Sequence, residues 1–155
     1  MQAMRAQTCC RCAEEFQVRP ARAEEYSRIK AILNAGKHPA FIGRQMVLDK
    51  TRNGGAMLFT LDGLDVAAAV VNPRLNVLLV LNVLPSHRGH GLGRALVDYL
   101  QCNFARVVQS AVPFFERCGY VTIGKAKKGN RLYTQVMVRA SLLKLAGRMA
   151  KLYQV

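Results

Sequence analysis

The sequence predicts an α/β fold with a single mixed central sheet of about six to seven strands, flanked by helices. Three observations support this prediction. The chain of 155 residues is long enough for one domain with a hydrophobic core. Segments of strand character alternate with amphipathic helical segments. A continuous apolar run over 76–84, typical of a strand buried on both faces, leads into a glycine-rich turn that opens a helix.

The first half of the chain contains one short strand, two helices and a hairpin. Residues 16–20 are expected to form the strand, and residues 21–36 a helix closed by Gly36. A second helix is expected over 39–52. Two β-rich runs on either side of Asp62 and Gly63 predict a hairpin over 56–71.

The second half adds a strand, a helix, another strand, a short helix, a hairpin and a terminal helix. Apolar residues on one face support the first of these helices, because their spacing matches the helical period; they are Leu92, Ala95, Leu96, Tyr99 and Leu100. The elements are expected at the strand 76–84, the strand 106–112, the helix 113–119, the hairpin 120–126 with 131–140, and the helix 141–153.

Positive charge dominates the composition. Lys and Arg number 23 against 9 Asp and Glu, which gives a net charge of +14. From Val66 to the end there are 13 cations, with only Asp98 and Glu116 as anions. Such a field attracts polyanions, and nucleic acid is the largest candidate. The alternative is a basic protein whose charge serves solubility.

Neither a membrane span nor a secretory signal is expected. The longest apolar stretch is interrupted by Asn72, Pro73, Arg74 and Asn76, well short of the roughly 18–20 apolar residues that a membrane helix needs. The N-terminus lacks a basic segment followed by an apolar one. We therefore expect a cytoplasmic protein with no membrane contact.

The cysteines and the N-terminal segment indicate neither a disulfide framework nor a metal site. An odd number of cysteines, five, suits a reducing compartment. Cys9 and Cys12 have the spacing of a zinc-binding pair, with Cys10 between them, but no second pair follows. We expect residues 1–14 to be a flexible leader and 15–155 to be a single domain that holds no metal.

The glycine-rich turn is the strongest functional signal. Gly89, Gly91 and Gly93 alternate directly before the helix, and glycines let the backbone approach a ligand closely. Backbone N–H groups at a helix N-terminus bind anions. The dinucleotide-binding pattern would need glycine where Arg94 stands, and the P-loop's lysine and hydroxyl residue are absent. An anion-binding turn of another kind remains.

Two motifs resemble a known family. The run VLPSHRGHGLGRALVDYL (83–100) is similar to the acyl-CoA-binding motif of the GNAT superfamily of N-acetyltransferases. The run AVPFFERCGY (111–120) resembles the second signature of that superfamily, a short helix with a paired aromatic start. The two motifs stand about 20 residues apart with a strand between them, and the element order from Phe16 to about Arg139 also matches.

The resemblance implies acetyl-CoA as co-substrate, with its pyrophosphate on the backbone of residues 88–94. Its pantetheine arm would enter between two splayed strands, around 77–85 and 106–112. The backbone N–H of Val83 would polarise the thioester carbonyl. An amine would then attack directly, without a covalent acyl-enzyme. The expected cofactor-binding residues are Val83, Arg88, Gly89, His90, Gly91, Leu92, Gly93, Arg94 and Phe114.

The chain lacks the proton-transfer groups that many members of this superfamily carry. No acid lies on the strand before the turn, and Phe115 stands where a tyrosine commonly acts as general acid. Val108 likewise replaces a frequent asparagine. Asn82 and Ser110 are the weak candidates for a catalytic or positioning role in addition to the Val83 N–H, and the alternative for each is a structural hydrogen bond. His38, between the two early helices, is a candidate base.

The acceptor amine is unknown, and three function classes stay open. The first is an N-acetyltransferase acting on an amine, and the second is an acyltransferase that modifies a nucleic acid, either a DNA base or an aminoacyl-tRNA. The third is a non-catalytic acyl-CoA-binding module, favoured by the missing acid and base. Charge alone supports a nucleic-acid partner. The cations that would contact it are Lys127, Lys128, Arg131, Lys144, Arg148 and Lys151.

Overall fold

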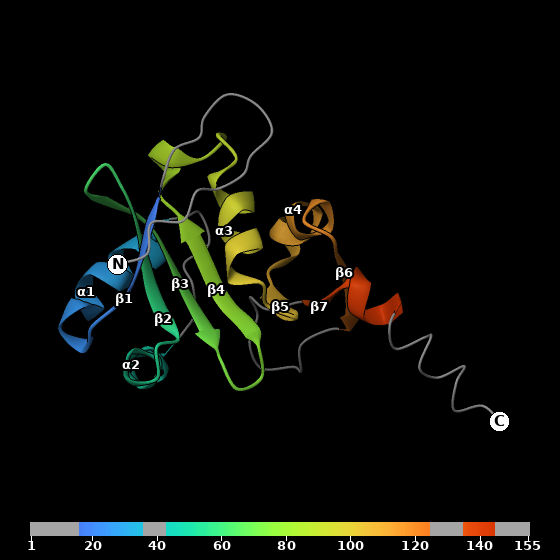
Figure 1. The fold of residues 1–155 in the computed structure, drawn as a ribbon, viewed down its shortest axis with the longest axis horizontal. Helices are drawn as coiled ribbons and strands as arrows, with labels where there is room; N and C mark the ends of the chain where they lie inside the picture. The colour runs from blue at the N-terminus through green and yellow to red at the C-terminus, as the bar shows by residue number, and fades with distance from the viewer. Residues whose placement is uncertain (1–15, 36–42, 125–134, 145–155) are drawn as a thin grey trace.

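Seven strands form one mixed sheet in the order β1-β2-β3-β4-β5-β7-β6 (Figure 1). The computed structural model describes residues 16–35, 43–124 and 135–144. All neighbouring strands pair antiparallel except β4 and β5, which are parallel. The fold class is as predicted. The strands are β1 Gln17–Pro20, β2 Ala56–Leu61, β3 Leu64–Asn72, β4 Val77–Val83, β5 Phe104–Val107, β6 Tyr120–Gly124 and β7 Gln135–Arg139.

Helices cover both faces of this sheet. Side chains of α1 (Tyr26–Leu33) and α2 (Arg44–Arg52) share a buried cluster with Leu58 and Ala68. Side chains of α3 (Leu92–Leu100) and α4 (Val112–Arg117) join a second cluster with Phe59 and Ala67. Because successive side chains of a strand point to opposite faces, these adjacent residues of β2 and β3 place the two helix pairs on opposite sides of the sheet.

The predicted stripe on α3 packs as expected. Leu96 is fully buried, and Leu92, Ala95, Tyr99 and Leu100 lie partly buried against the same cluster. The helix begins after Gly91, which is left-handed, and ends at Gln101, also left-handed with φ 48°. A left-handed residue after the last turn is a common way to end a helix. The stripe therefore fixes α3, and the turn before it, against the sheet.

The hairpin of β2 and β3 also agrees with the sequence. Its two central residues, Asp62 and Gly63, have φ values of 49° and 78°. Positive φ at both positions defines the mirror-image turn that matches the twist of paired strands, and Asp-Gly is one of its preferred sequences. The turn sets the register in which Leu61 lies opposite Leu64.

A bulge interrupts β4 where β5 leaves it. On one side Val70 pairs with Val80 and Val71 with Leu78, so Leu79 is an extra residue in β4. On the other side β5 pairs with β4 only through Phe104 opposite Val77 and Ala105 opposite Leu78. Bulges bend a strand and end its pairing, which explains why the two strands diverge beyond Leu78.

Several predicted boundaries were wrong. The strand expected over 106–112 occupies Phe104–Val107, and a 3₁₀ turn, Gln109–Ala111, precedes α4. β5 has no pair with β4 beyond Ala105, and its pairing with the described part of β7 ends at Val107 opposite Gln135. The helix expected over 21–36 starts as a 3₁₀ turn, Ala23–Glu25, and its α-helical part ends at Leu33.

Other sequence-based assignments are only partly covered. The helix expected over 39–52 is present as α2, but residues 36–42 lie outside the described residues. Residues 140–144 are helical. The rest of the predicted terminal helix and the expected leader, 1–14, lie outside the described residues. Among the described helices, none is long and apolar enough to cross a membrane.

Candidate functional site

The glycine-rich turn adopts a conformation that its glycines make possible. Gly89 and Gly91 have φ values of 84° and 81°, a region that side chains rarely tolerate. A Cβ built on either residue meets nothing within 4 Å, so the backbone at both points is open. Gly91 is the residue that precedes α3, and its carbonyl accepts the hydrogen bond of Ala95 N–H at 3.1 Å. The turn therefore presents an open backbone at a helix N-terminus.

Gly93 serves packing instead. A Cβ on this residue would come within 3.3 Å of Cζ of Phe114, so the Phe114 ring lies directly against the first turn of α3. Phe114 itself packs edge-on against Phe115, with ring centroids 5.2 Å apart. Gly93 thus holds α3 close to α4, and with α3 it positions the N–H groups of the turn.

The open edge of β4 lies directly before this turn. Leu84 N–H donates to Val66 O at 2.8 Å, so Leu84 belongs to the hydrogen-bonded pairs of β3 and β4. Such pairs alternate along an antiparallel ladder. The backbone N–H and C=O groups of Asn82 therefore face β3, and those of Leu81 and Val83 face the β5 side. In the described part of the chain, β5 does not pair with β4 at either of these last two residues. Two N–H groups therefore face the gap between the diverging strands.

Arg88 ties the turn back to β4. Its Nε donates to Val83 O at 2.8 Å, and its Nη2 donates to Oδ1 of Asn82 at 2.8 Å. The Asn82 amide in turn donates to Ile32 O at 2.8 Å and to Leu33 O at 3.4 Å, at the C-terminal end of α1. The guanidinium of Arg88 and the amide of Asn82 thus join the turn, the end of β4 and the end of α1.

The remaining predicted residues lie at different depths. His90 and Arg94 are exposed beside the turn, and Leu92 is half-buried in the core beneath it. Ser110 is exposed on the 3₁₀ turn before α4, not on the strand where the sequence placed it. His38 lies outside the described residues.

Phe115 occupies a buried position. Only 7% of its surface is exposed, and its ring packs edge-on against Tyr120 with centroids 5.6 Å apart. Tyr120 donates its hydroxyl hydrogen to Cys102 O, and Nε of Arg139 donates to the same carbonyl at 2.9 Å. Burial raises the pKa of the Tyr120 hydroxyl. This phenol is therefore neutral at physiological pH and engaged in structure.

The two described cysteines are unsuited to nucleophilic catalysis. Burial raises the pKa of the Cys102 thiol. Burial also raises the pKa of the Cys118 thiol, and the nearby carboxylate of Asp98 raises it further. The reactive form of cysteine is the thiolate, and both shifts disfavour it. Within residues 16–35, 43–124 and 135–144, no group of three or more His, Cys, Asp or Glu side chains could hold a metal ion.

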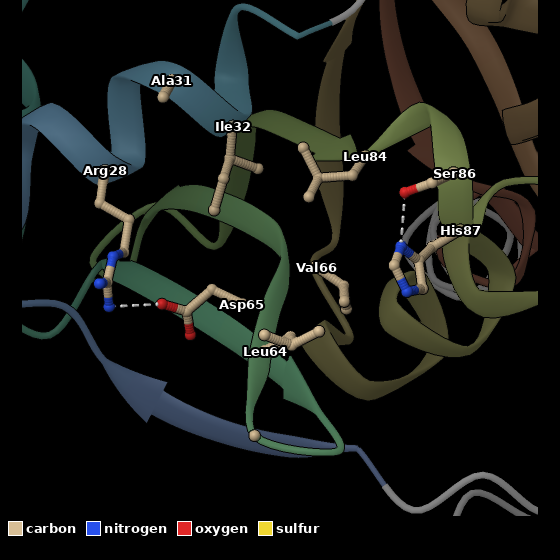
Figure 2. Close-up of a pocket in the computed structure, with 10 residues that line it drawn as sticks. Arg28, Ala31, Ile32, Leu64, Asp65, Val66, Leu84, Ser86 and His87 are labelled. Carbon is tan, nitrogen blue, oxygen red and sulfur yellow. Dashed lines mark hydrogen bonds and ion pairs between the residues drawn. The ribbon is translucent and has the colours of Figure 1, made fainter.

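A cavity of about 560 Å³ lies beside β3 and the segment that follows β4 (Figure 2). Figure 2 shows Arg28 and Asp65 on one side of it, and Ser86 and His87 on the other. The cavity lies between α1, the β2–β3 hairpin and the segment after β4, and none of its lining residues comes from β5. Its lining residues are Arg28, Ala31, Ile32, Gly63, Leu64, Asp65, Val66, Leu84, Ser86 and His87.

An ion network braces the wall of this cavity. Asp65 accepts hydrogen bonds from Arg28 Nη1 at 2.9 Å, Thr60 Oγ1 at 3.0 Å and Arg19 Nη2 at 3.3 Å. Both terminal nitrogens of Arg19 also contact Glu25, at 2.9 and 2.8 Å. The hydrogen bond from Arg19, with a second from the Arg22 backbone, lowers the pKa of Glu25 to about 2. The network fixes α1 against the hairpin.

Sequence reasoning missed two features of the site. It did not single out Leu81, whose N–H faces the gap like that of Val83, because the bulge that sets this orientation leaves no mark in an apolar run. It also missed the contact of Asn82 with α1, which joins residues 50 positions apart. An asparagine within an otherwise apolar strand was the available signal, since such a residue needs a hydrogen-bonding partner.

Comparison with solved structures finds the same fold in several other proteins. YjaB of Escherichia coli in its apo form is 19% identical, with a TM-score of 0.59 over 81% of this chain and 97% of that one. Naa50 of Arabidopsis thaliana, in complex with the bisubstrate analogue CoA-Ac-MVNAL, is 17% identical with a TM-score of 0.60, over 81% and 98%. The N-acetylglutamate synthase of Neisseria gonorrhoeae, with coenzyme A and N-acetyl-glutamate, is 16% identical with a TM-score of 0.59, over 80% and 34%.

Comparison with protein families gives a consistent result. No curated protein sequence matches the chain significantly. The family model described as the acetyltransferase (GNAT) domain matches residues 42–122, slightly more than half of the chain. This match spans α2, the bulged strand, the glycine-rich turn and α4. The chain belongs to the GNAT acetyltransferase family.

Proposed function

We propose that the protein is an N-acetyltransferase that uses acetyl-CoA and transfers the acetyl group to an amine by direct attack in a ternary complex. The observation that carries the proposal is the adjacency of two features: the open glycine turn at the start of α3, and the unpaired edge of β4 that leads into it. The first suits the pyrophosphate of the co-substrate, and the second suits its extended amide-containing arm.

The turn fits a pyrophosphate in three respects. Gly89 and Gly91 leave open space where side chains would block close approach. The helix dipole of α3 favours negative charge at its N-terminus. Arg94, exposed on the first turn of α3, adds a positive charge beside the amides. Two of the solved GNAT structures contain coenzyme A or an analogue built on it, which supports the same ligand here.

The gap fits the arm because β4 offers it a strand-like edge. Val83 and Leu81 both direct an N–H into the gap, about 7 Å apart given a rise of roughly 3.3 Å per residue. Val83 is nearer to the turn and Leu81 is deeper. Acetyl-CoA supplies the thioester, which lies at the end of the arm farthest from the pyrophosphate. One of these N–H groups would stabilise the developing charge on the thioester oxygen, and the other would pair with an amide of the arm.

The chain would accelerate the reaction mainly by positioning. The amine nitrogen forms its bond to the acetyl carbon, the carbon–sulfur bond breaks, and the proton lost by the amine balances the thiolate that leaves. Phe115 offers no proton, and within the described part of β4 no side chain is acidic. Holding two reactants in a productive geometry can contribute about 7–11 kcal/mol to lowering the barrier. Among the described cysteines, burial raises the pKa of the Cys102 and Cys118 thiols and so disfavours the thiolate, which supports direct attack over an acyl-enzyme on either of them.

Within the described residues, the charge distribution favours a small or protein-borne amine over a nucleic acid. Exposed cations of the described residues occur on both layers, for example Arg44 and Arg52 on α2 and Arg94 and Arg117 on α3 and α4. A nucleic-acid interface would gather them on one face. Of the cations expected to contact nucleic acid, Lys144 is exposed; Lys127, Lys128, Arg131, Arg148 and Lys151 lie outside the described residues.

The test is release of free CoA thiol from acetyl-CoA in the presence of an amine panel. The panel holds peptide α-amines, lysine peptides, free amino acids, arylamines and aminoacyl-tRNA. We expect one class to release thiol in a protein-dependent way, with the acetylated product found by mass spectrometry. Tight binding of acetyl-CoA with no turnover on any class would instead support the non-catalytic module. No binding of acetyl-CoA by calorimetry would reject both readings.

A further inference from the structure

Arg88 connects three parts of the molecule that the proposed reaction must coordinate. Its guanidinium bonds to Val83 O, at the open edge of β4, and to Oδ1 of Asn82, whose side chain lies on the face of the sheet that α1 covers. Asn82 passes the connection to the carbonyls of Ile32 and Leu33. Arg88 itself belongs to the turn on which the co-substrate's phosphates are expected to bind.

We propose that Arg88 and Asn82 are positioning residues that transmit acetyl-CoA binding at the turn to the C-terminal end of α1. This inference rests on the proposed function. It concerns how the site is held together, and it gives Arg88 a role beyond attraction of an anion. The end of α1 lies on the face of the sheet that α1 and α2 cover, so the connection runs from the co-substrate turn to that face.

The guanidinium has the geometry for this role. An arginine carries five N–H donors in one plane, and the two bonds to β4 use Nε and Nη2. Donors on the same rigid plane remain for an anion at the turn. A phosphate that engages them would fix the plane and, through it, the Val83 carbonyl and the Asn82 amide. Lysine, with a single ammonium on a flexible stem, could not hold both acceptors in this way.

A substitution at Asn82 can remove the hydrogen bonds to α1 and keep the hydrogen bond to Arg88. Its oxygen faces Arg88 and its nitrogen faces the α1 carbonyls. Asn82→Asp keeps an oxygen for Arg88 and turns that hydrogen bond into an ion pair, but replaces the donor to Ile32 O with a second acceptor. The variant therefore preserves the β4–turn half of the connection and removes the α1 half. Arg88→Met removes the opposite half.

The readout is hydrogen exchange at the end of α1, which needs no acceptor. Asn34 N–H donates to Lys30 O at 2.9 Å, and Ala35 N–H donates to Ile32 O at 3.2 Å. Both amides lie next to the carbonyls that Asn82 holds. In the parent protein, saturating acetyl-CoA is expected to slow exchange in the peptide covering residues 26–35 by about tenfold or more. Calorimetry on the same samples gives the dissociation constant of acetyl-CoA.

Four proteins make the comparison: the parent, Asn82→Asp, Arg88→Met and the control Arg74→Met. Arg74 is an exposed arginine in the β3–β4 turn, and its substitution should leave both measurements unchanged. Asn82→Asp should bind acetyl-CoA within threefold of the parent and lose the slowed exchange in α1. Arg88→Met should weaken acetyl-CoA binding by tenfold or more. When this variant is saturated with acetyl-CoA, it should also lack the slowed exchange in α1. Asn82→Ser serves if Asn82→Asp fails to fold.

The outcomes separate the two proposals. Tight binding of acetyl-CoA without slowed exchange at the end of α1 in the parent overturns the connection and leaves the proposed function standing. Slowed exchange that persists in Asn82→Asp also overturns the proposed connection, because acetyl-CoA binding then affects α1 without the Asn82 hydrogen bonds. Absence of acetyl-CoA binding to the folded parent overturns both.

Discussion

The ring of Phe114 lies against Gly93 so closely that a single added carbon on Gly93 would stand 3.3 Å from Cζ of the ring. This contact joins the two sequence motifs, since Gly93 belongs to the turn and Phe114 to the aromatic pair that starts α4. It also gives the third glycine a packing role, although its φ angle is not one that requires glycine. The packing of α3 on α4 depends on it.

We therefore expect Gly93→Val to destabilise the fold. The branched side chain would push the Phe114 ring away, and overpacking of this kind costs about 1–3 kcal/mol of the free energy of unfolding. Urea denaturation measures the loss. The double variant Gly93→Val/Phe114→Leu should recover part of it, because leucine leaves room at Cζ. Equal stability of the single and double variants would show that the contact does not limit packing.

Gly91→Glu should abolish acetyl-CoA binding. The substitution forces a side chain into a backbone with φ 81° and places a negative charge at the proposed phosphate site. Gly54→Glu is the matched control, since Gly54 has φ 74° with nothing near its Cβ, in the turn after α2. Both variants carry the same backbone strain and charge. Calorimetry should show binding lost only for Gly91→Glu, and loss in both would point to a general effect of strain.

Phe115→Tyr should not introduce a general acid that the enzyme uses. The side chain is buried against Tyr120, so the new hydroxyl enters an apolar contact and costs about 1–3 kcal/mol of stability unless it finds a partner. We expect the rate of thiol release to stay within tenfold of the parent. A general acid that operates contributes about 10²–10⁴-fold, so a gain in that range would contradict this prediction.

The sequence was sufficient where local chemistry decides the structure. Asp62 and Gly63 encode their turn through the conformations they tolerate, and Gly89 and Gly91 encode the open turn before α3 in the same way. The apolar period of α3 predicts its buried stripe, which the structure confirms. In each case the determining residues are neighbours in the sequence, so reading them in order is enough.

The sequence was insufficient where partners lie far apart. The loss of pairing between β5 and β4 beyond Ala105 goes with the bulge at Leu79, about 26 residues earlier, because bulges bend a strand and end its pairing. The orientation of Leu81 and Val83 follows from the same bulge. Asn82 meets α1 only through tertiary packing. These contacts shape the candidate site, which is why its outline was predictable and its internal connections were not.

Binding to nucleic acid should depend only moderately on salt. The exposed cations of the described residues are divided between the two layers, so a duplex on one face would contact few of them. For about three phosphate contacts, affinity should fall less than roughly 50-fold between 50 and 200 mM salt, against about 10³-fold for six or more. Fluorescence anisotropy with labelled DNA and tRNA measures the slope. A steep slope, weakened by reversing Lys127, Lys128 and Arg131, would revive the nucleic-acid acceptor.

The ion network around Arg19 should make stability depend on pH in acid. In the fold the pKa of Glu25 is lowered from 4.5 to about 2, chiefly by the hydrogen bond from Arg19. Because this pKa is depressed, the folded state binds a proton at Glu25 less readily than the unfolded chain. The carboxylate's contribution is therefore fully present above pH 4.5 and is lost as the pH falls through 2.

Glu25→Gln isolates this contribution, since glutamine keeps the shape of the side chain without its charge. Urea denaturation at pH 7 should find the variant less stable than the parent. The difference should shrink steadily from pH 4.5 to pH 2, because protonation removes the same charge from the parent. Asp49→Asn is the control, as Asp49 is an exposed carboxylate whose ion pair with Arg52 spans 3.5 Å on the surface of α2. A stability difference for Glu25→Gln that stays constant over this range would show that the hydrogen-bonded shape, and not the charge, stabilises α1 against the hairpin.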